Sequence, residues 1–482
     1  MIKEKQEKSN SIIKILFILA SILFAMPSIM YILQKKTVLQ FGPYFQFLYS
    51  ENISRITQTI LYILILAILT ILYVIILKNR KAMFKNTKTM FIFIAIIAII
   101  FVSVLPFTCS DIFYYLGIGR LGSTYEQNPY YTTIKQFVEQ ENQQELLQKD
   151  TVLEQGYIND WSDSTVVYGP VWTLICELIA GLSFGSIDFG LLLFKLVNVC
   201  IHLGNAYLLY KITNKKLFAL LYGLNPFVLI EGIASVHNDM FVIFFILSGL
   251  YFLLKKKNLL VTVIFLALAT AIKYFAILLL PFVVIYFTRK EKPIKRLIKC
   301  IQYGVIFVGV LVIPYLFYIQ DGQVISGLFI QQEKIAKSFY VILTEYFRNP
   351  TISVTKVNHF LLIAFVIVYF FTCVTLLNKK TIAFRTEIKK ANYFIMIFLF
   401  LLITNFQPWY ILWLFPLLPW QSAEDIKWIT QIAIISEFAN SIFLTYGEGW
   451  QNGTPFVFVF VVASLGIRIL NQEMRRKKFW IS

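Results

Sequence analysis

Long apolar runs recur along almost the whole 482-residue chain, and they constrain its fold more than any other feature. A run of about 18 or more apolar residues can cross a bilayer as an α-helix. Runs such as 12–33, 56–77 and 188–210 are too long, and too apolar on every face, for the alternating strands of a membrane barrel. The composition, 58% hydrophobic and only 15% charged, also excludes an ordinary soluble domain.

The apolar runs predict an all-α, polytopic membrane protein with about 12–14 transmembrane helices. Several runs are shorter than a full span and fit half-helices or tilted segments. Gly169 and Pro170 interrupt one of them, and we expect a split or re-entrant element there. No low-complexity linker divides the chain, so residues 1–482 are expected to form a single membrane domain.

Basic residues are concentrated between the apolar runs and account for the net charge of +18. Lysine and arginine clusters of this kind mark cytoplasmic loops and also attract anionic membrane lipid, so no nucleic acid is needed to explain them. The clusters predict a multi-pass protein of the plasma membrane with both termini in the cytoplasm. They lie at 78–88, 255–257, 289–299, 378–380 and 475–478.

The segment 109–166 is the first large loop that this topology places outside the cell. It carries nine acidic and only three basic residues, which fits an outer location. Part of it has apolar residues at helical spacing among polar ones, as in helices that lie flat on a membrane surface. Because loops of this length usually serve a function, we expect an outer catalytic loop with interfacial helices.

The five cysteines form no CxxC pair and show no metal-ligand spacing. Cys176, Cys200 and Cys373 fall inside apolar runs and are expected to be small core residues. The sequence therefore gives no sign of a disulfide framework.

Several polar and aromatic residues lie where apolar sequence meets the predicted outer face. Charge at that depth is costly and usually marks a functional site. Structural explanations also exist: Asp111 could cap a helix, Arg120 could extend to the headgroups, and the Gln407–Tyr410 stretch could be an interfacial belt. The set comprises Asp111, Arg120, Asn128, Tyr130, Tyr168, His237, Asn238, Asp239, Lys273, Gln407, Trp409 and Tyr410.

These residue types suit the transfer of a sugar from a lipid phosphate. Arg120, His237 and Lys273 could bind a phosphate at the headgroup level. Aromatic rings and amide side chains suit a sugar, which has an apolar C–H face and a rim of hydroxyls. Asp111 could accept the proton of an attacking hydroxyl.

The order of the motifs resembles the GT-C superfamily of integral-membrane glycosyltransferases. It is most similar to the bacterial polyprenol-phosphate-mannose-dependent mannosyltransferases, and the similarity covers residues from about 90 to about 420. The motifs that carry it are DIFYY…GR…NPY, YGPVW, LNPFVLIEGIASVHND, AIKYFAILLLPF and PWYILWLFPLL.

The resemblance implies a multi-helix fold with an active site at the outer face and a donor sugar carried on polyprenyl phosphate. It implies that Asp111 is the catalytic base of the first outer loop, and that Arg120, His237–Asp239 and Lys273 lie in the site. Many relatives have two neighbouring acids in that loop, whereas this chain has Ser110–Asp111. We therefore expect no metal and no other cofactor.

The sugar and the acceptor stay open at this stage. Mannose is implied by the resemblance, while glucose, galactose and N-acetylhexosamines fit the residues equally well. The acceptor could be a cell-envelope glycan, a lipid or a protein. Two other functions are compatible with the sequence: a transporter or flippase of a lipid-linked glycan, and a glycan polymerase or ligase.

Overall fold

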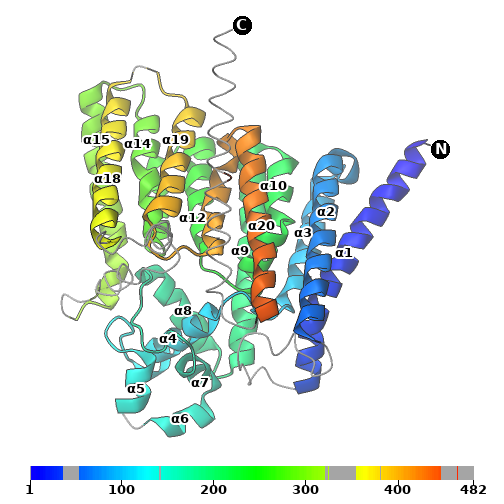
Figure 1. Ribbon diagram of the computed structural model, residues 1–482. Helices are drawn as coiled ribbons and strands as arrows, with labels where there is room; N and C mark the ends of the chain where they lie inside the picture. The colour runs from blue at the N-terminus through cyan, green and yellow to red at the C-terminus, as the bar shows by residue number, and fades with distance from the viewer. Residues whose placement is uncertain are drawn as a thin grey trace.

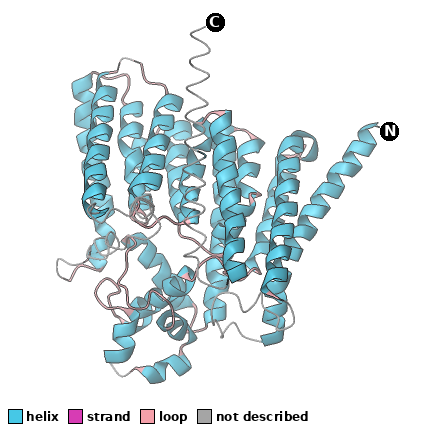
Figure 2. Ribbon diagram, in the orientation of Figure 1, coloured by secondary structure: helices cyan, strands magenta, loops and turns pink. Residues whose placement is uncertain are grey.

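The computed structural model describes residues 2–35, 54–140, 143–320, 324, 354–379, 381–446 and 464. Every regular element among these residues is a helix, as Figure 2 shows. The prediction of an all-α, multi-pass membrane protein is confirmed. The apolar run at 454–470, apart from Ser464, and the basic cluster at 475–478 lie outside the described residues.

Fewer helices than predicted are long and apolar enough to span a membrane. Among the described residues there are five, or six if the bent pair Lys216–Gly223 and Pro226–Ala234 forms one span. The prediction of about 12–14 also included shorter elements, and several apolar runs do fold as helices of 10–17 residues. The five are Gln6–Leu33, Ile56–Met83, Ile187–Thr213, Pro293–Phe317 and Lys356–Asn378.

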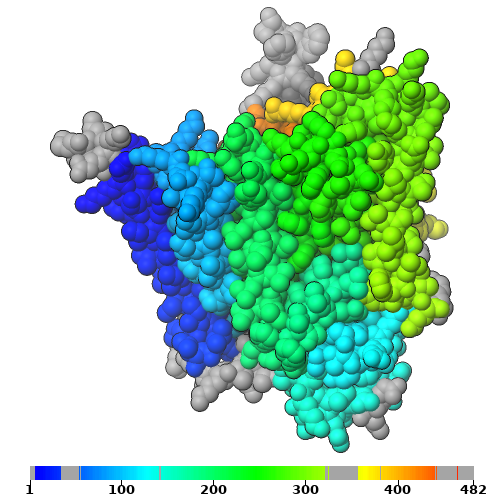
Figure 3. Space-filling model, turned by 180° about the vertical axis from the view of Figure 1, so that it is seen from behind, coloured from blue at the N-terminus to red at the C-terminus, as the bar shows by residue number. Residues whose placement is uncertain are grey.

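Three helices at the N-terminal side form one flank of the molecule (Figures 1 and 3). The Asn86 side chain accepts a hydrogen bond from the Lys88 amide and so begins the third helix. The chain then leaves this helix toward Cys109 and the outer segment. The three are α1 (Ile2–Lys35), α2 (Arg55–Met83) and α3 (Thr87–Val102).

The segment 109–166 forms a small helical lobe beyond one end of the membrane helices (Figure 1). Helix α8 (Pro170–Leu182) packs against its first helix, and it has only 13 residues, which agrees with an element that does not span. The two backbones approach so closely that a Cβ on Gly119 would lie 2.2 Å from the carbonyl oxygen of Cys176. The lobe consists of α4 (Asp111–Tyr125), α5 (Ile134–Gln140), α6 (Gln144–Lys149) and α7 (Thr151–Tyr157).

Helix α9 (Ile187–Thr213) presents a row of buried polar side chains to the interior. Lys195 donates to the carbonyls of Val104 and Ala234. Asn198 donates to Gly232, and Asn205 donates to Met240. Because backbone carbonyls outside regular helices need partners, this row fixes the broken segment between residues 232 and 240.

The opposite face of α9 is apolar and exposed. Leu192 and Leu196 lie there, and Cys200 follows at the same four-residue spacing. The prediction of a core position for Cys200 is therefore wrong, because a membrane helix can turn a small apolar residue outward. Cys176 is buried as predicted, and Cys373 is partly buried.

The remaining described elements complete the helical body. Near its centre, three prolines (Pro408, Pro416 and Pro419) lack the amide that an α-helix needs, and their segment winds as a 3₁₀ helix. The elements are α10 (Lys216–Gly223), α11 (Pro226–Leu229), η1 (Ile230–Ala234), α12 (Asp239–Tyr251), η2 (Phe252–Lys256), α13 (Leu259–Thr270), η3 (Tyr274–Leu279), α14 (Leu280–Phe287), α15 (Pro293–Val312), η4 (Ile313–Phe317), α18 (Val354–Asn378), α19 (Phe384–Ile397), η5 (Phe398–Leu402), η6 (Pro408–Trp420) and α20 (Ala423–Tyr446).

Candidate active site

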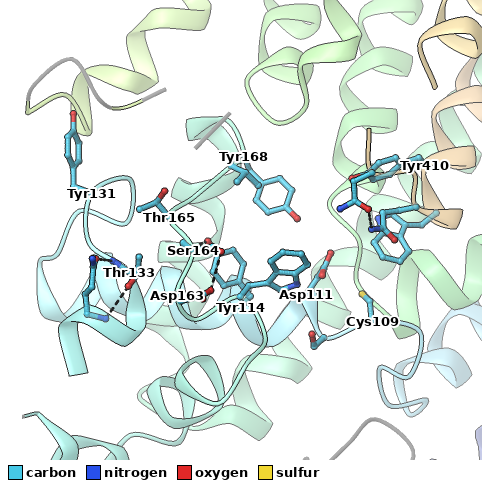
Figure 4. A pocket seen from close by; sticks show the side chains of 17 residues that line it. Cys109, Asp111, Tyr114, Tyr131, Thr133, Asp163, Ser164, Thr165, Tyr168 and Tyr410 are labelled. Atoms are coloured by element: carbon cyan, nitrogen blue, oxygen red, sulfur yellow. Dashed lines mark hydrogen bonds between the residues drawn. The ribbon is translucent and has the colours of Figure 1, made fainter. Parts of the chain in front are cut away.

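A cavity of about 450 Å³ lies between the helical lobe and the start of η6 (Figure 4). Its volume is in the range that holds a sugar-sized ligand. The Gln407 side chain lines it, and the Gln407 Oε1 atom has no hydrogen-bond partner among the described residues. The predicted site residues on its wall are Asp111, Tyr168, Gln407, Trp409 and Tyr410.

Asp111 is the first residue of α4, and its side chain reaches the cavity wall (Figure 4). The residue is only 8% exposed, and the Tyr115 hydroxyl donates to its Oδ2 atom over 3.2 Å. Burial raises the pKa of Asp111 above its usual range, although the electrostatic effects of His237 and Lys273 oppose this shift. A carboxylate with a raised pKa is a stronger base, which suits it to accept a proton from a hydroxyl.

His237 lies behind the cavity wall in the break between η1 and α12. It is completely buried, its ring stacks on Trp409 at 4.1 Å, and its Nε2 atom lies 3.1 Å from Glu231 Oε2. The preceding residue, Val236, has a φ of 61°. A β-branched residue rarely adopts this left-handed conformation, so the strain at Val236 marks a backbone held in place by its surroundings.

Lys273 and Asp239 form a buried ion pair next to this segment. The Lys273 Nζ atom lies 2.7 and 2.8 Å from the two carboxylate oxygens of Asp239. Trp413 Nε1 also donates to Asp239, and the Lys273 ammonium lies 4.6 Å from the centre of the Tyr410 ring. Because the carboxylate is fully satisfied, the pair can stay charged in an apolar environment.

A second cavity, of about 340 Å³, adjoins the first one. Its lining is largely apolar, but Lys273 and His359 both contribute to it. The Asp111 carboxylate lines the first cavity and the Lys273 ammonium lines the second. The two cavities share a wall, whose residues Val167, Tyr168, Asn405 and Tyr410 line both.

Three predicted site residues are engaged elsewhere in the lobe. Arg120 Nε lies 2.5 Å from Asp150 Oδ2, and neither cavity includes Arg120 in its lining. Asn128 donates to the Tyr318 carbonyl, and the Tyr130 hydroxyl donates to the Tyr168 carbonyl. These contacts fix the lobe against its neighbours.

The side-chain amide of Asn238 is buried beside the ion pair. Neither its Nδ2 nor its Oδ1 atom has a hydrogen-bond partner among the described residues. A buried amide without partners is costly, which is typical of a site that a ligand or water completes.

Sequence reasoning missed four residues of this region. Cys109 and Asp163 line the first cavity, Glu231 contacts His237, and Trp413 contacts Asp239. Glu231 and Trp413 occur inside the motifs quoted above, and an acid within an apolar run is a signal that could have singled out Glu231. Asp163 is one of many loop acids, and only the fold distinguishes it.

The family of the chain follows from a match over residues 16–289, which is more than half of its length. The matching model is described as "Alpha-(1->6)-mannopyranosyltransferase, N-terminal domain". The chain belongs to this family. The resemblance to polyprenyl-phosphate-mannose-dependent GT-C enzymes is thereby confirmed, and the prediction of a hexosyltransferase with it.

Membership of this mannosyltransferase family implies a mannose donor and an acceptor. Neither the curated proteins nor the solved structures contain a match to the chain.

Proposed function

We propose that this member of the α-(1→6)-mannopyranosyltransferase family transfers mannose from polyprenyl phosphate to an acceptor hydroxyl with inversion, and that Asp111 is the general base. One observation carries the proposal: Asp111 lines one cavity, Lys273 lines the next, and the two cavities share a wall. An acceptor and a leaving phosphate on opposite sides of one sugar are what an inverting displacement requires.

The second cavity is the proposed donor site. Its apolar residues suit the isoprenoid chain, while Lys273 supplies a cationic group and His359 supplies ring nitrogens as hydrogen-bond partners for the phosphate. The charge that builds on the leaving phosphate would then be stabilised by groups already in place. Tyr168 and Tyr410, on the shared wall, offer aromatic faces for the mannose.

The first cavity is the proposed acceptor site. Asp111 reaches it from α4 with a raised pKa, so a hydroxyl in the cavity could lose its proton to the carboxylate as it attacks. A (1→6) linkage requires a primary 6-hydroxyl, so we propose a hexose of a cell-envelope glycan or glycolipid as acceptor, rather than a protein. Gln407, whose carbonyl oxygen has no partner in the described part of the chain, is available to orient this hexose.

The distribution of basic residues supports an outer location for this site. Figure 1 shows the α2–α3 and α18–α19 turns at the end of the molecule farthest from the helical lobe. The basic residues of 78–88 and 385–390 lie at or near these turns. By the positive-inside rule this end faces the cytoplasm, and the lobe faces out of a plasma membrane.

The anomeric configuration of the donor provides the test. Inversion to an α-(1→6) product requires a β-linked donor, so the purified protein should transfer mannose from β-mannosyl phosphopolyprenol and not from the α-linked lipid. Transfer from the α-linked lipid alone would refute inversion. Movement of the lipid across vesicles without a new bond would indicate a transporter, and use of lipid-linked oligosaccharides only would indicate a polymerase or ligase.

A further inference from the structure

We propose that Cys109, Asp111 and His237 bind a divalent metal ion, with zinc as the best match, at the inner end of the first cavity. This inference goes beyond the proposed transfer reaction, because metal binding can be measured in protein that transfers no sugar. Asp111 would coordinate through Oδ2, the oxygen near His237 Nδ1, and Oδ1 would remain to accept the proton of the acceptor hydroxyl. The inference also differs from the expectation of no metal, which rested on the missing second acid in the outer loop.

The three side chains are brought together by the fold. Their potential ligand atoms all lie within 4.8 Å of one another. His237 Nδ1 is 3.9 Å from Asp111 Oδ2 and 3.9 Å from Cys109 Sγ. A tetrahedral zinc ion with bonds of about 2.0–2.3 Å separates its ligands by roughly 3.3–3.8 Å, so coordination requires only small side-chain movements.

The contacts of the imidazole indicate that Nδ1 is the coordinating nitrogen. The other nitrogen, Nε2, lies 3.1 Å from Glu231 Oε2, and Glu231 also accepts a hydrogen bond of 2.8 Å from the Thr108 hydroxyl. A histidine that binds a metal almost always donates its second N–H to a carboxylate, carbonyl or water. The Cys109 sulfur lies closer to Nε2, at 3.3 Å, so it must rotate toward Nδ1 to join the ion.

The surroundings hold two of these ligands, His237 and Asp111, in place. The His237 ring stacks on Trp409 with an interplanar angle of 16°, and Tyr115 donates to Asp111 Oδ2. His237 also follows the strained Val236, whose φ is 61°. Strained backbone is retained where the surrounding structure fixes a functional residue.

The donor types favour zinc over calcium or magnesium. Thiolate and imidazole are ligands of zinc, whereas calcium and magnesium prefer oxygen. Three protein ligands leave a fourth position, as in catalytic zinc sites. Cys109 and Asp111 both line the cavity, so the fourth position faces the space of the proposed acceptor (Figure 4).

Metal content and cobalt spectroscopy test this site. The full chain, purified through a tag without histidine and stripped with a chelator, is reloaded with Zn²⁺ or Co²⁺ alone. We expect one ion per chain and, for Co²⁺, a thiolate charge-transfer band in the near ultraviolet. Cys109→Ser should abolish the band. Glu231→Gln should keep the band but weaken metal binding about 10- to 100-fold, because it loosens the His237 contact.

Cys176→Ser is the matched control, since Cys176 is also buried but lies in α8 outside the cluster. It should keep both the stoichiometry and the band. Less than stoichiometric metal in the parent protein would overturn the proposal, and so would a band that survives Cys109→Ser, because either result indicates an adventitious ion only. Neither readout uses sugar transfer, so failure of the proposed function would leave the test valid.

Discussion

Replacing Lys273 with methionine should destabilise the protein strongly, because the substitution leaves a buried charge without its counter-ion. Asp239 is fully buried, and both of its carboxylate oxygens contact the Lys273 ammonium at 2.7 and 2.8 Å. Among the described residues, only Trp413 would still donate to that carboxylate after the substitution. Removing one partner of a buried ion pair typically costs about 3–5 kcal/mol of folding free energy.

A double variant separates this effect from a role in donor binding. In Lys273→Met/Asp239→Asn both charges are gone, and the asparagine can still accept the Trp413 hydrogen bond. We expect the double variant to recover most of the lost stability. If Lys273 also binds the donor phosphate, as proposed, the double variant should fold well and still bind polyprenyl-phosphate mannose weakly.

The assay is unfolding in mixed micelles together with a donor-binding titration. Lys299→Met is the matched control, because the Lys299–Glu291 pair is partly exposed and should contribute at most about 1 kcal/mol. A loss below about 1 kcal/mol in Lys273→Met would refute the account of the ion pair. Full recovery of donor affinity in the double variant would limit Lys273 to a structural role.

Three other results are expected. In chelator-treated protein, Asp111→Asn should raise the midpoint temperature of unfolding at neutral pH and not at acidic pH. The reason is that the raised pKa of the Asp111 carboxyl makes the folded state lose stability as pH rises. An equal shift at both pH values would contradict this. Arg120→Gln should lower stability about as much as Asp150→Asn, with little further loss in the double variant, since the two side chains form one partly buried ion pair. Additive losses would disprove the coupling. Gly119→Ala should cost about 1–3 kcal/mol in thermal unfolding through a backbone clash, whereas Gly304→Ala, with open space around it, should cost nothing.

The sequence was sufficient to predict the fold class, because bilayer thickness limits what a long apolar run can form. It could not show which apolar runs fold as short helices, since hydropathy alone does not reveal where a helix ends. The row of buried polar side chains on α9 shows a second limit of prediction from the sequence. Lys195 and Asn198 look like interruptions of an apolar run, yet their partners are carbonyls that only the folded chain brings near.

For a similar reason, the sequence was sufficient to predict some residues of the cavity but not others. Asp111, Trp409 and Tyr410 share a cavity as expected, because each lies where a helix begins or breaks. Arg120 could not be assigned from the sequence, since its partner Asp150 is one of several acids in the same loop. Cys109 gave no signal, because its relation to His237 depends on a contact between residues 128 positions apart.

The transfer rate of Asp111→Asn is the most direct test of the general-base assignment. With saturating donor and acceptor, the purified variant should transfer mannose about 10² to 10⁴ times more slowly than the parent protein. Asp163→Asn, which removes the other carboxylate of the same cavity, should be affected far less. A parental rate in Asp111→Asn, or a larger loss in Asp163→Asn, would contradict the account.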